Sequence, residues 1–100
     1  MRAARVDQNQ KDVIAEIRSA LKGCTVTDLS AVGKGMPDII IGWKNRNWLI
    51  EIKNPKQKPS DRKLSDAQVR WHGKWAGQAH VAHSASEAIA VIAETLQHER

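Results

Sequence analysis

Two apolar runs separated by a short polar segment constrain the fold of this chain most strongly. The first run is Asp38-Ile-Ile-Ile-Gly42, preceded by Pro37, and the second extends from Trp48 to Lys53. The segment between them contains Lys44-Asn-Arg-Asn47, whose residue types are common in turns. Because both runs are rich in residues that favour strands, the pattern predicts an antiparallel β-hairpin.

The predicted register of this hairpin gathers charged side chains on one face. With the turn centred on Asn45 and Arg46, Asp38 faces Lys53 and Glu51 lies diagonally across from Asp38. Facing side chains are roughly 5 Å apart and diagonal ones about 7–8 Å. Two carboxylates at that spacing could hold one divalent cation beside a lysine. The alternative is an exposed cross-strand ion pair, which contributes less than about 1 kcal/mol. The same register makes Trp43 and Trp48 a cross-strand pair.

A metal interpretation of this face agrees with the chemistry of phosphodiester hydrolysis. Mg²⁺ prefers a few carboxylates, several waters and phosphate oxygens. A bound divalent cation can polarise a phosphate and lower the pKa of a water. A neighbouring lysine can stabilise the negative charge that develops in the transition state. Asp38, Glu51 and Lys53 are therefore candidate catalytic residues.

The rest of the chain predicts helices and strands around the hairpin. A helix should begin at Asp7, with Gln10 completing a capping box, and end at Gly23. A second helix should run from Ser65, paired with Gln68, to about Ala76, where Gly77 ends it. Strands are expected at Thr25 to Leu29 and at Ala79 to His83, and a last helix after Ser84 with an apolar face of Ala88, Ile89, Ile92 and Leu96. The fold class is therefore α/β in the order α-β-β-β-α-β-α, a central mixed sheet flanked by helices in one domain, residues 1–100.

Composition narrows the class of protein. The 100 residues include 41% hydrophobic ones and carry a net charge of +5, an ordinary globular balance. No apolar run approaches the roughly 20 residues of a membrane-spanning helix, and no apolar segment follows the arginines of the N-terminus. The single cysteine, Cys24, excludes an internal disulfide and fits a reducing compartment. We expect a cytoplasmic protein.

Clustered cations suggest a polyanionic partner. The residues expected to contact DNA are Lys34, Lys56, Lys58, Arg62 and Lys63. The alternative is an ordinary solvated surface. Trp71 and Trp75, four residues apart on the predicted helix after Gln68, could stack on bases. A pair with this spacing packs more often into a core or a subunit interface, and we expect packing here.

The segment Gly35-Met-Pro-Asp-Ile-Ile-Ile-Gly-Trp-Lys-Asn-Arg-Asn-Trp-Leu-Ile-Glu-Ile-Lys53 resembles the motif of the PD-(D/E)XK nuclease superfamily. That motif has Pro-Asp at one strand and Glu-x-Lys on the next, here Pro37-Asp38 and Glu51-Ile52-Lys53. The Gly35-Met-Pro-Asp38 start and Leu64-Ser-Asp-Ala-Gln68 resemble the VRR-NUC branch, which includes small stand-alone proteins of bacteriophages and prophages. The resemblance covers roughly Gln10 to Ile92.

The resemblance implies roles for individual residues. Asp38, Glu51 and the backbone carbonyl of Ile52 would bind Mg²⁺ or Mn²⁺, and Lys53 would be the catalytic lysine. Gln68 would support the site or contact a phosphate, in addition to capping its helix. The family resemblance also implies a homodimer, as in archaeal-type junction resolvases. Many relatives carry a first-helix glutamate that reaches the metal; this chain has Asn9 and Gln10 in that region, which could act through water.

Three functional hypotheses follow. The first is a metal-dependent DNA endonuclease that selects branched DNA such as a four-way junction, because no segment looks like a sequence-reading element. The second is a catalytically weak or inactive nuclease fold that binds nucleic acid, which the missing first-helix acid favours and the complete Asp38, Glu51 and Lys53 set opposes. The third is a subunit that assembles with another phage or host protein.

Overall fold

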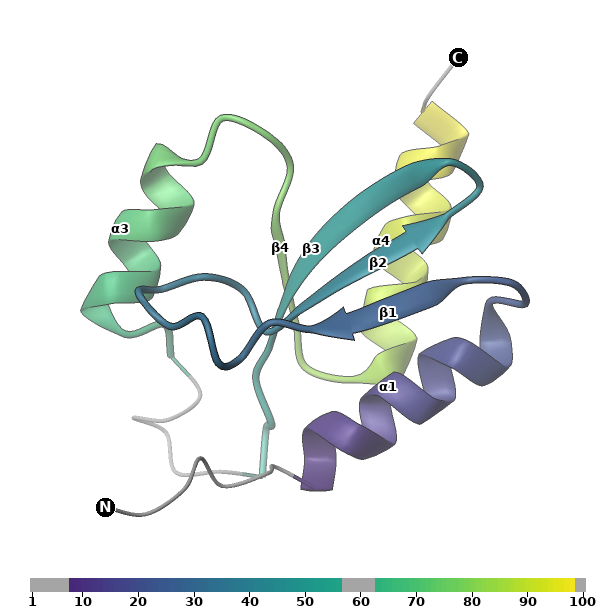
Figure 1. Ribbon diagram of the computed structural model, residues 1–100, viewed down its shortest axis with the longest axis horizontal. Coiled ribbons are helices and arrows are strands. Elements are labelled where there is room, and N and C mark those ends of the chain that lie inside the picture. The colour runs from purple at the N-terminus through teal and green to yellow at the C-terminus, as the bar shows by residue number, and fades with distance from the viewer. Residues whose placement is uncertain (1–7, 57–62, 99–100) are drawn as a thin grey trace.

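The computed structural model describes residues 8–56 and 63–98 of the chain (Figure 1). Its elements are α1 (Gln8–Ala20), β1 (Thr25–Asp28), β2 (Ile39–Trp43), β3 (Arg46–Ile52), α3 (Asp66–Lys74), β4 (His80–Ala82) and α4 (Ala85–His98). The predicted order α-β-β-β-α-β-α and the α/β class are confirmed. Among the described residues, no helix is both long and apolar enough to span a membrane.

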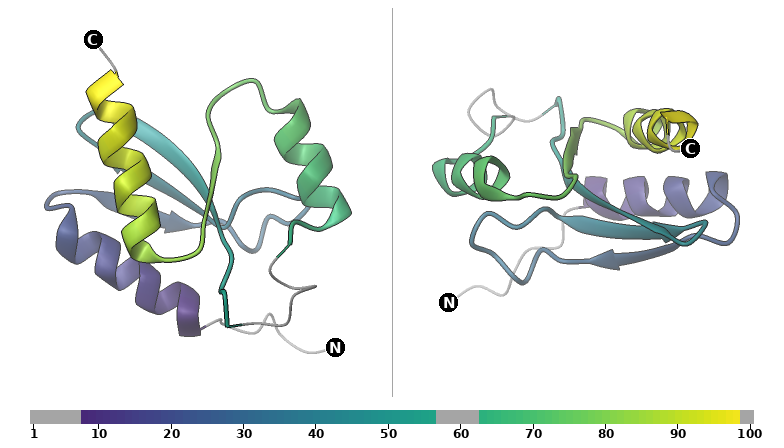
Figure 2. Two further views of the ribbon diagram at one scale, coloured as in Figure 1. Left: turned by 180° about the vertical axis from the view of Figure 1, so that it is seen from behind. Right: turned by 90° about the horizontal axis from the view of Figure 1, so that it is seen from above.

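The four strands form one mixed sheet in the order β1-β2-β3-β4. The first three strands are antiparallel to their neighbours, and β4 runs parallel to β3. A parallel pair needs a crossover connection, which here contains α3. Helices α1 and α4 cover the same face of the sheet, whereas α3 stands apart, near the end at which β2 begins and β3 ends (Figures 1 and 2).

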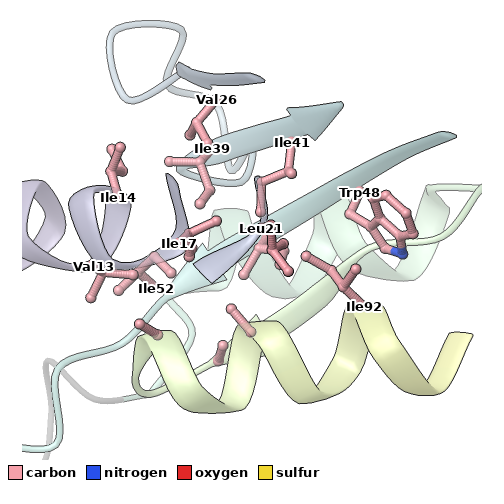
Figure 3. Close-up of a cluster of buried hydrophobic side chains, with 14 residues drawn as sticks. Val13, Ile14, Ile17, Leu21, Val26, Ile39, Ile41, Trp48, Ile52 and Ile92 are labelled. Carbon is pink, nitrogen blue, oxygen red and sulfur yellow. The ribbon is translucent and has the colours of Figure 1, made fainter. Parts of the chain in front are cut away.

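The hydrophobic core lies between the sheet and the pair α1 and α4 (Figure 3). Alternate residues of the hairpin point into it, because successive side chains of a strand face opposite ways. Its buried members are Val13, Ile14, Ile17, Leu21, Val26, Ile39, Ile41, Trp48, Ile50, Ile52, Ala82, Ala85, Ala88 and Ile92. Every residue of β3 that does not face this core, Glu51 among them, faces the opposite side of the sheet.

Several predicted boundaries shift by one or two residues. The predicted N-cap of α1, Asp7, lies outside the described residues. Helix α3 ends at Lys74 rather than near Ala76, because Trp75 adopts an extended conformation and its N–H donates back to the carbonyl of Trp71 at 3.0 Å. The capping box of Ser65 and Gln68 at the start of α3 is confirmed.

The predicted hairpin register is wrong by two residues. Trp43 pairs with Arg46 and Ile39 with Ile50, so the turn consists of Lys44 and Asn45 alone. Both have positive φ, 52° and 64°, as a two-residue turn that matches the twist of the strands requires. Because the shift is an even number of residues, it changes the partners without moving any side chain to the other face.

The register also corrects the tryptophan pair. Trp48 lies opposite Ile41, is fully buried in the core, and donates its indole N–H to Thr95 Oγ1 at 2.8 Å. Trp43 instead packs at the edge of the core and donates to the carbonyl of Lys22 at 2.9 Å. The two indoles therefore have separate polar partners and are not a cross-strand pair.

Candidate active site

Two carboxylates lie together where β2 begins and β3 ends, on the face of the sheet away from the core. Asp38 immediately precedes β2, and extending the observed register by one step places it opposite Glu51 rather than opposite Lys53. Asp38 Oδ2 accepts a hydrogen bond from the backbone N–H of Ile52 at 2.8 Å. Glu51 is only 2% exposed. The hairpin backbone thus fixes the Asp38 carboxylate directly beside the buried Glu51.

Lys53 and Gln68 complete this cluster from β3 and α3. Gln68 Nε2 donates to Glu51 Oε2 at 2.9 Å, and Lys53 Nζ donates to Gln68 Oε1 at 3.0 Å. Lys53 Nζ also lies 3.6 Å from Glu51 Oε2. The same Gln68 Oε1 accepts the N–H of Ser65 at 2.8 Å as part of the capping box. Gln68 therefore caps α3 and links Lys53 to Glu51, so that both predicted contributions occur together.

Burial and proximity make this carboxylate pair difficult to ionise fully. Burial raises the pKa of Glu51 to about 8, and the negative charge of Asp38 adds to the rise against the opposing charge of Lys53. Burial also raises the pKa of Asp38, although the hydrogen bond from Ile52 opposes it. Full ionisation of both carboxylates would place more negative charge here than Lys53 alone balances.

The donor set fits a hard divalent cation. Glu51 Oε1 is buried and has no hydrogen-bond partner among the described residues, so it is an acceptor that lacks a counterpart. No group of three or more His, Cys, Asp and Glu side chains within residues 8–56 and 63–98 could hold a metal ion. Two carboxylates would leave the other coordination positions to carbonyl, water or phosphate oxygens, which is the arrangement Mg²⁺ accepts.

The first helix reaches this region through Asp28, a residue that the sequence did not single out. Gln10 is buried and donates to Asp28 Oδ2 at 3.0 Å, while Ser30 donates to Oδ1 from its backbone and hydroxyl. The charge of Asp28 contributes to the raised pKa of Asp38. The hydrogen bond of the Gln10 side chain thus goes to Asp28, and Asn9 beside it is half-buried. The position of Asp28 beside Asp38 follows from the β1–β2 register, which pairs Asp28 with Ile39.

His72 is a second neighbour that the sequence did not indicate. Burial and the charge of Lys53 lower the pKa of His72, which places a neutral imidazole near the lysine. Its Nε2 is buried without a hydrogen-bond partner among the described residues. The spacing from Gln68 could have indicated His72 in the sequence, because a residue four positions after Gln68 lies on the same face of the helix.

The predicted DNA-contacting cations are only partly described. Lys34, Lys56 and Lys63 are exposed, whereas Lys58 and Arg62 lie outside the described residues. Among the described residues, Trp71 and Trp75 are not part of the hydrophobic core, and α3 has no buried residue. The two tryptophans therefore do not pack into the core of this chain, and packing at a subunit interface stays a prediction.

Comparisons with known proteins identify the fold and family. A solved structure described as a VRR_NUC domain superposes with a TM-score of 0.60 and 25% identity, over 86% of this chain and 91% of that one. Curated relatives named ribonuclease H are similar too: that of Bordetella avium is 38% identical over 60% of this chain and 41% of its own length. That of Phenylobacterium zucineum is 34% identical over 90% of this chain and 64% of its own length.

The chain therefore spans between two fifths and two thirds of the length of these ribonucleases H. The model of the VRR-NUC domain matches residues 3–88, nearly the whole chain. This match covers both strands of the hairpin, the carboxylate pair, Lys53 and Gln68. On this match, with the superposed structure in agreement, the chain belongs to the VRR-NUC domain family of nuclease domains.

Proposed function

We propose that this protein is a divalent-metal-dependent endonuclease that hydrolyses phosphodiester bonds in branched DNA. The observation that carries the proposal is the carboxylate pair beside Lys53. Asp38 is half-buried and Glu51 buried, and Glu51 Oε1 lacks a hydrogen-bond partner among the described residues. Asp38 and Glu51, with the backbone carbonyl of Ile52, would hold Mg²⁺ or Mn²⁺. Either cation would polarise the scissile phosphate and lower the pKa of the attacking water.

The protein's own residues would position the reactants. The Ile52 N–H fixes the orientation of the Asp38 carboxylate, and Gln68 Nε2 fixes that of Glu51. Gln68 Oε1 holds the ammonium of Lys53 3.6 Å from Glu51 Oε2. From there Lys53 would stabilise the negative charge that develops on the phosphate oxygens. Gln68 is thus a positioning residue in this scheme, and Lys53 a catalytic one.

The substrate proposal rests on what the fold offers for recognition. All seven described elements belong to the nuclease fold itself. The exposed cations Lys34, Lys56 and Lys63 would contact phosphates in a sequence-independent way. Shape would then select the DNA. A two-fold homodimer would present two sites to a symmetric four-way junction. Light scattering of the protein alone and with a junction tests the dimer.

A cleavage panel tests the activity. Linear duplex, single strand, flap, splayed arm and four-way junction are incubated with Mg²⁺, Mn²⁺ or EDTA. We expect cutting of branched DNA with either metal and none with EDTA. Lys53→Ala should lose about a hundred- to a thousandfold in rate. Lys11→Ala, which removes the same charge from an exposed position of α1, should leave the rate unchanged. Binding without cutting in either metal would refute the nuclease proposal and favour the binding module.

A second candidate substrate follows from the relatives named ribonuclease H. Their similarity to this chain makes an RNA–DNA hybrid a necessary member of the same panel. The carboxylate pair and Lys53 could act on an RNA strand or a DNA strand, because the scissile group is a phosphodiester in both. Preferential cutting of the hybrid over every branched DNA would replace the DNA proposal while leaving the metal-dependent mechanism in place.

A further inference from the structure

A pocket of about 460 Å³ lies on α3, next to the candidate active site but separate from its carboxylates. Its walls are two indoles, three cations and one small side chain. The lining residues are Lys34, Ala67, Arg70, Trp71, Lys74 and Trp75. Within the described part of the chain, no hydrogen bond or ion pair joins these residues to Asp38 or Glu51, and the proposed cleavage step does not use them; Lys34 alone is also a proposed phosphate contact.

The two indoles form a preorganised stack. The rings of Trp71 and Trp75 lie 4.8 Å apart between centroids with an interplanar angle of 16°. Trp75 is 44% exposed, and its indole N–H donates to the carbonyl of Gln78 at 3.2 Å. Such rings lose little conformational entropy when a further aromatic ring stacks on them. An exposed, anchored indole stack is a platform for a flat aromatic group.

The backbone brings Lys34 to this platform. Gly33, Lys34 and Gly35 have consecutive positive φ angles of 71°, 60° and 85°. A Cβ on Gly35 would collide with the carbonyl of Ala67 and lie 2.9 Å from Trp71 Cβ, so only glycine lets the loop lie against α3. Lys34 is the one member of this triplet for which positive φ is unfavourable. A lysine held in this unfavourable conformation at the wall of a pocket suggests a role for its ammonium group.

The charge of the pocket selects its ligand. Lys34, Arg70 and Lys74 contribute three positive charges, and no acidic residue of the described part of the chain lines the walls. Aromatic platforms flanked by cations suit single-stranded nucleic acid, whose bases stack and whose phosphates pair with Lys and Arg. An apolar protein partner would leave three ammonium and guanidinium groups without counter-ions.

The pocket and the candidate active site share one face of α3. Gln68, Trp71 and Trp75 are spaced i, i+3 and i+7, which places them along one stripe of the helix. With a rise of about 1.5 Å per residue, the indoles lie about 5–11 Å along the axis from Gln68. A strand whose phosphate reaches Lys53 could therefore continue over the indole stack.

We propose that this pocket binds an unpaired nucleotide on the strand that flanks the cleaved phosphate. The base stacks on the Trp71–Trp75 platform, and Lys34, Arg70 and Lys74 contact the adjoining phosphates. The inference builds on the proposed nuclease function and specifies its substrate: nucleic acid with a single-stranded segment beside the cut, such as a flap or splayed arm. The recognition itself requires no catalysis.

Binding measured in EDTA separates this proposal from the nuclease proposal. Fluorescence anisotropy would use labelled dT20, rU20, a blunt duplex and a splayed arm. Because stacking on one aromatic residue contributes about 1–3 kcal/mol per base, Trp75→Leu should weaken binding of single strands and of the splayed arm about 5- to 150-fold. Affinity for the blunt duplex should change less than twofold. Comparing dT20 with rU20 tells whether the pocket discriminates DNA from RNA.

Three further variants isolate the contributions. Trp71→Leu should act like Trp75→Leu, and the exposed Trp75 keeps the test decisive if the former fails to fold. Lys34→Asn removes the charge but keeps a residue that tolerates positive φ, so it should weaken binding without loss of thermal stability. Trp43→Phe is the matched control. Trp43 also has a cation beside its ring, with Lys44 Nζ 4.8 Å from the ring centroid, but it lies at the hairpin turn and does not line the pocket.

Two results would overturn the proposal. One is an equal change, or no change, for all four nucleic acids in Trp75→Leu. The other is a drop in molecular mass from dimer to monomer in the same variant, which would make the platform a subunit interface. Absence of cleavage with every metal would refute the nuclease proposal alone, since these binding measurements proceed without metal.

Discussion

At the scale of single residues, the candidate site is defined by groups that the fold leaves unsatisfied. Glu51 is buried with one oxygen lacking a partner, and Asp38 lies beside it with a raised pKa. Apolar residues at these two positions would give a more stable fold, because burying like charges is unfavourable. The pair is explained if a cation neutralises it during function.

The raised pKa of Glu51 predicts how stability depends on pH without metal. Its pKa is about 8 in the folded chain against 4.5 as the ordinary value. Between these values the folded state binds more protons than the unfolded state, so stability should fall as pH rises from about 4.5 to 8. The slope should not exceed about 1.4 kcal/mol per pH unit for this group. Urea denaturation in EDTA at pH 5, 6.5 and 8 measures this dependence of the free energy of unfolding on pH.

Glu51→Gln is the control for this prediction. The amide keeps the shape of the carboxyl but does not titrate, so the variant should lose most of the pH dependence and be more stable than the parent at pH 8. A parent protein whose stability in EDTA is constant from pH 5 to 8 would contradict the prediction.

At the scale of elements, two local motifs hold the site together. The capping box of Ser65 and Gln68 starts α3 and simultaneously carries Gln68 to Glu51 and Lys53. The two-residue turn of Lys44 and Asn45 sets the register that places Asp38 opposite Glu51. Each motif can be tested by a pair of substitutions that separates its local effect from its effect on the site.

Ser65→Ala and Gln68→Ala should destabilise the protein similarly but differ in activity. Each removes part of the capping box, at a loss of about 0.5–2 kcal/mol in free energy of unfolding. Only Gln68→Ala also removes the hydrogen bonds to Glu51 and Lys53, so only this variant should lose cleavage rate, by about tenfold or more for roughly 1.4 kcal/mol. Chemical denaturation and initial rates at 10 °C measure both; equal rates in the two variants would contradict the positioning role of Gln68.

Introducing valine at two neighbouring positions of the hairpin tests which residues form the turn. Asn45 has positive φ, which a β-branched residue adopts only at a loss of about 1–2 kcal/mol. Arg46 begins β3, where valine is favoured. Asn45→Val should therefore lower the melting temperature and Arg46→Val should leave it unchanged or higher. The opposite order would support the turn centred on Asn45 and Arg46.

At the scale of the whole molecule, the sheet separates stability from chemistry. One face carries the core under α1 and α4 (Figure 3). Glu51 lies on the other face, where it meets Lys53 and Gln68 of α3. The site can therefore hold repelling carboxylates because the opposite face supplies a continuous apolar core.

Ile92→Ala tests this separation. Ile92 is fully buried on α4, so the substitution should lower the free energy of unfolding by about 2–5 kcal/mol. The cleavage rate per folded molecule at 10 °C should remain within about twofold of the parent, because Ile92 packs in the core, on the face of the sheet opposite the carboxylate pair. A loss of rate in proportion to the loss of stability, under conditions where the variant is folded, would show that core and site are coupled.

The sequence by itself determined the identity and order of the elements. Apolar periodicity placed the helix faces of Ile17 and Ile92, and the Ser65–Gln68 motif located the start of α3, because these signals depend on near neighbours. It also placed Asp38, Glu51 and Lys53 on one face, since strand alternation has a period of two residues and the error in register was also two.

Only the tertiary structure decided which residues meet across elements. Three features depend on how α1 and α3 lie against the sheet: the bond of Gln10 to Asp28, the half-buried imidazole of His72 near Lys53, and the exposure of Trp75 in the indole stack. Such contacts join residues remote in sequence and have no local periodicity. Turn conformation decided the hairpin register, and packing decided that α3 keeps its indoles at the surface, beside the candidate site.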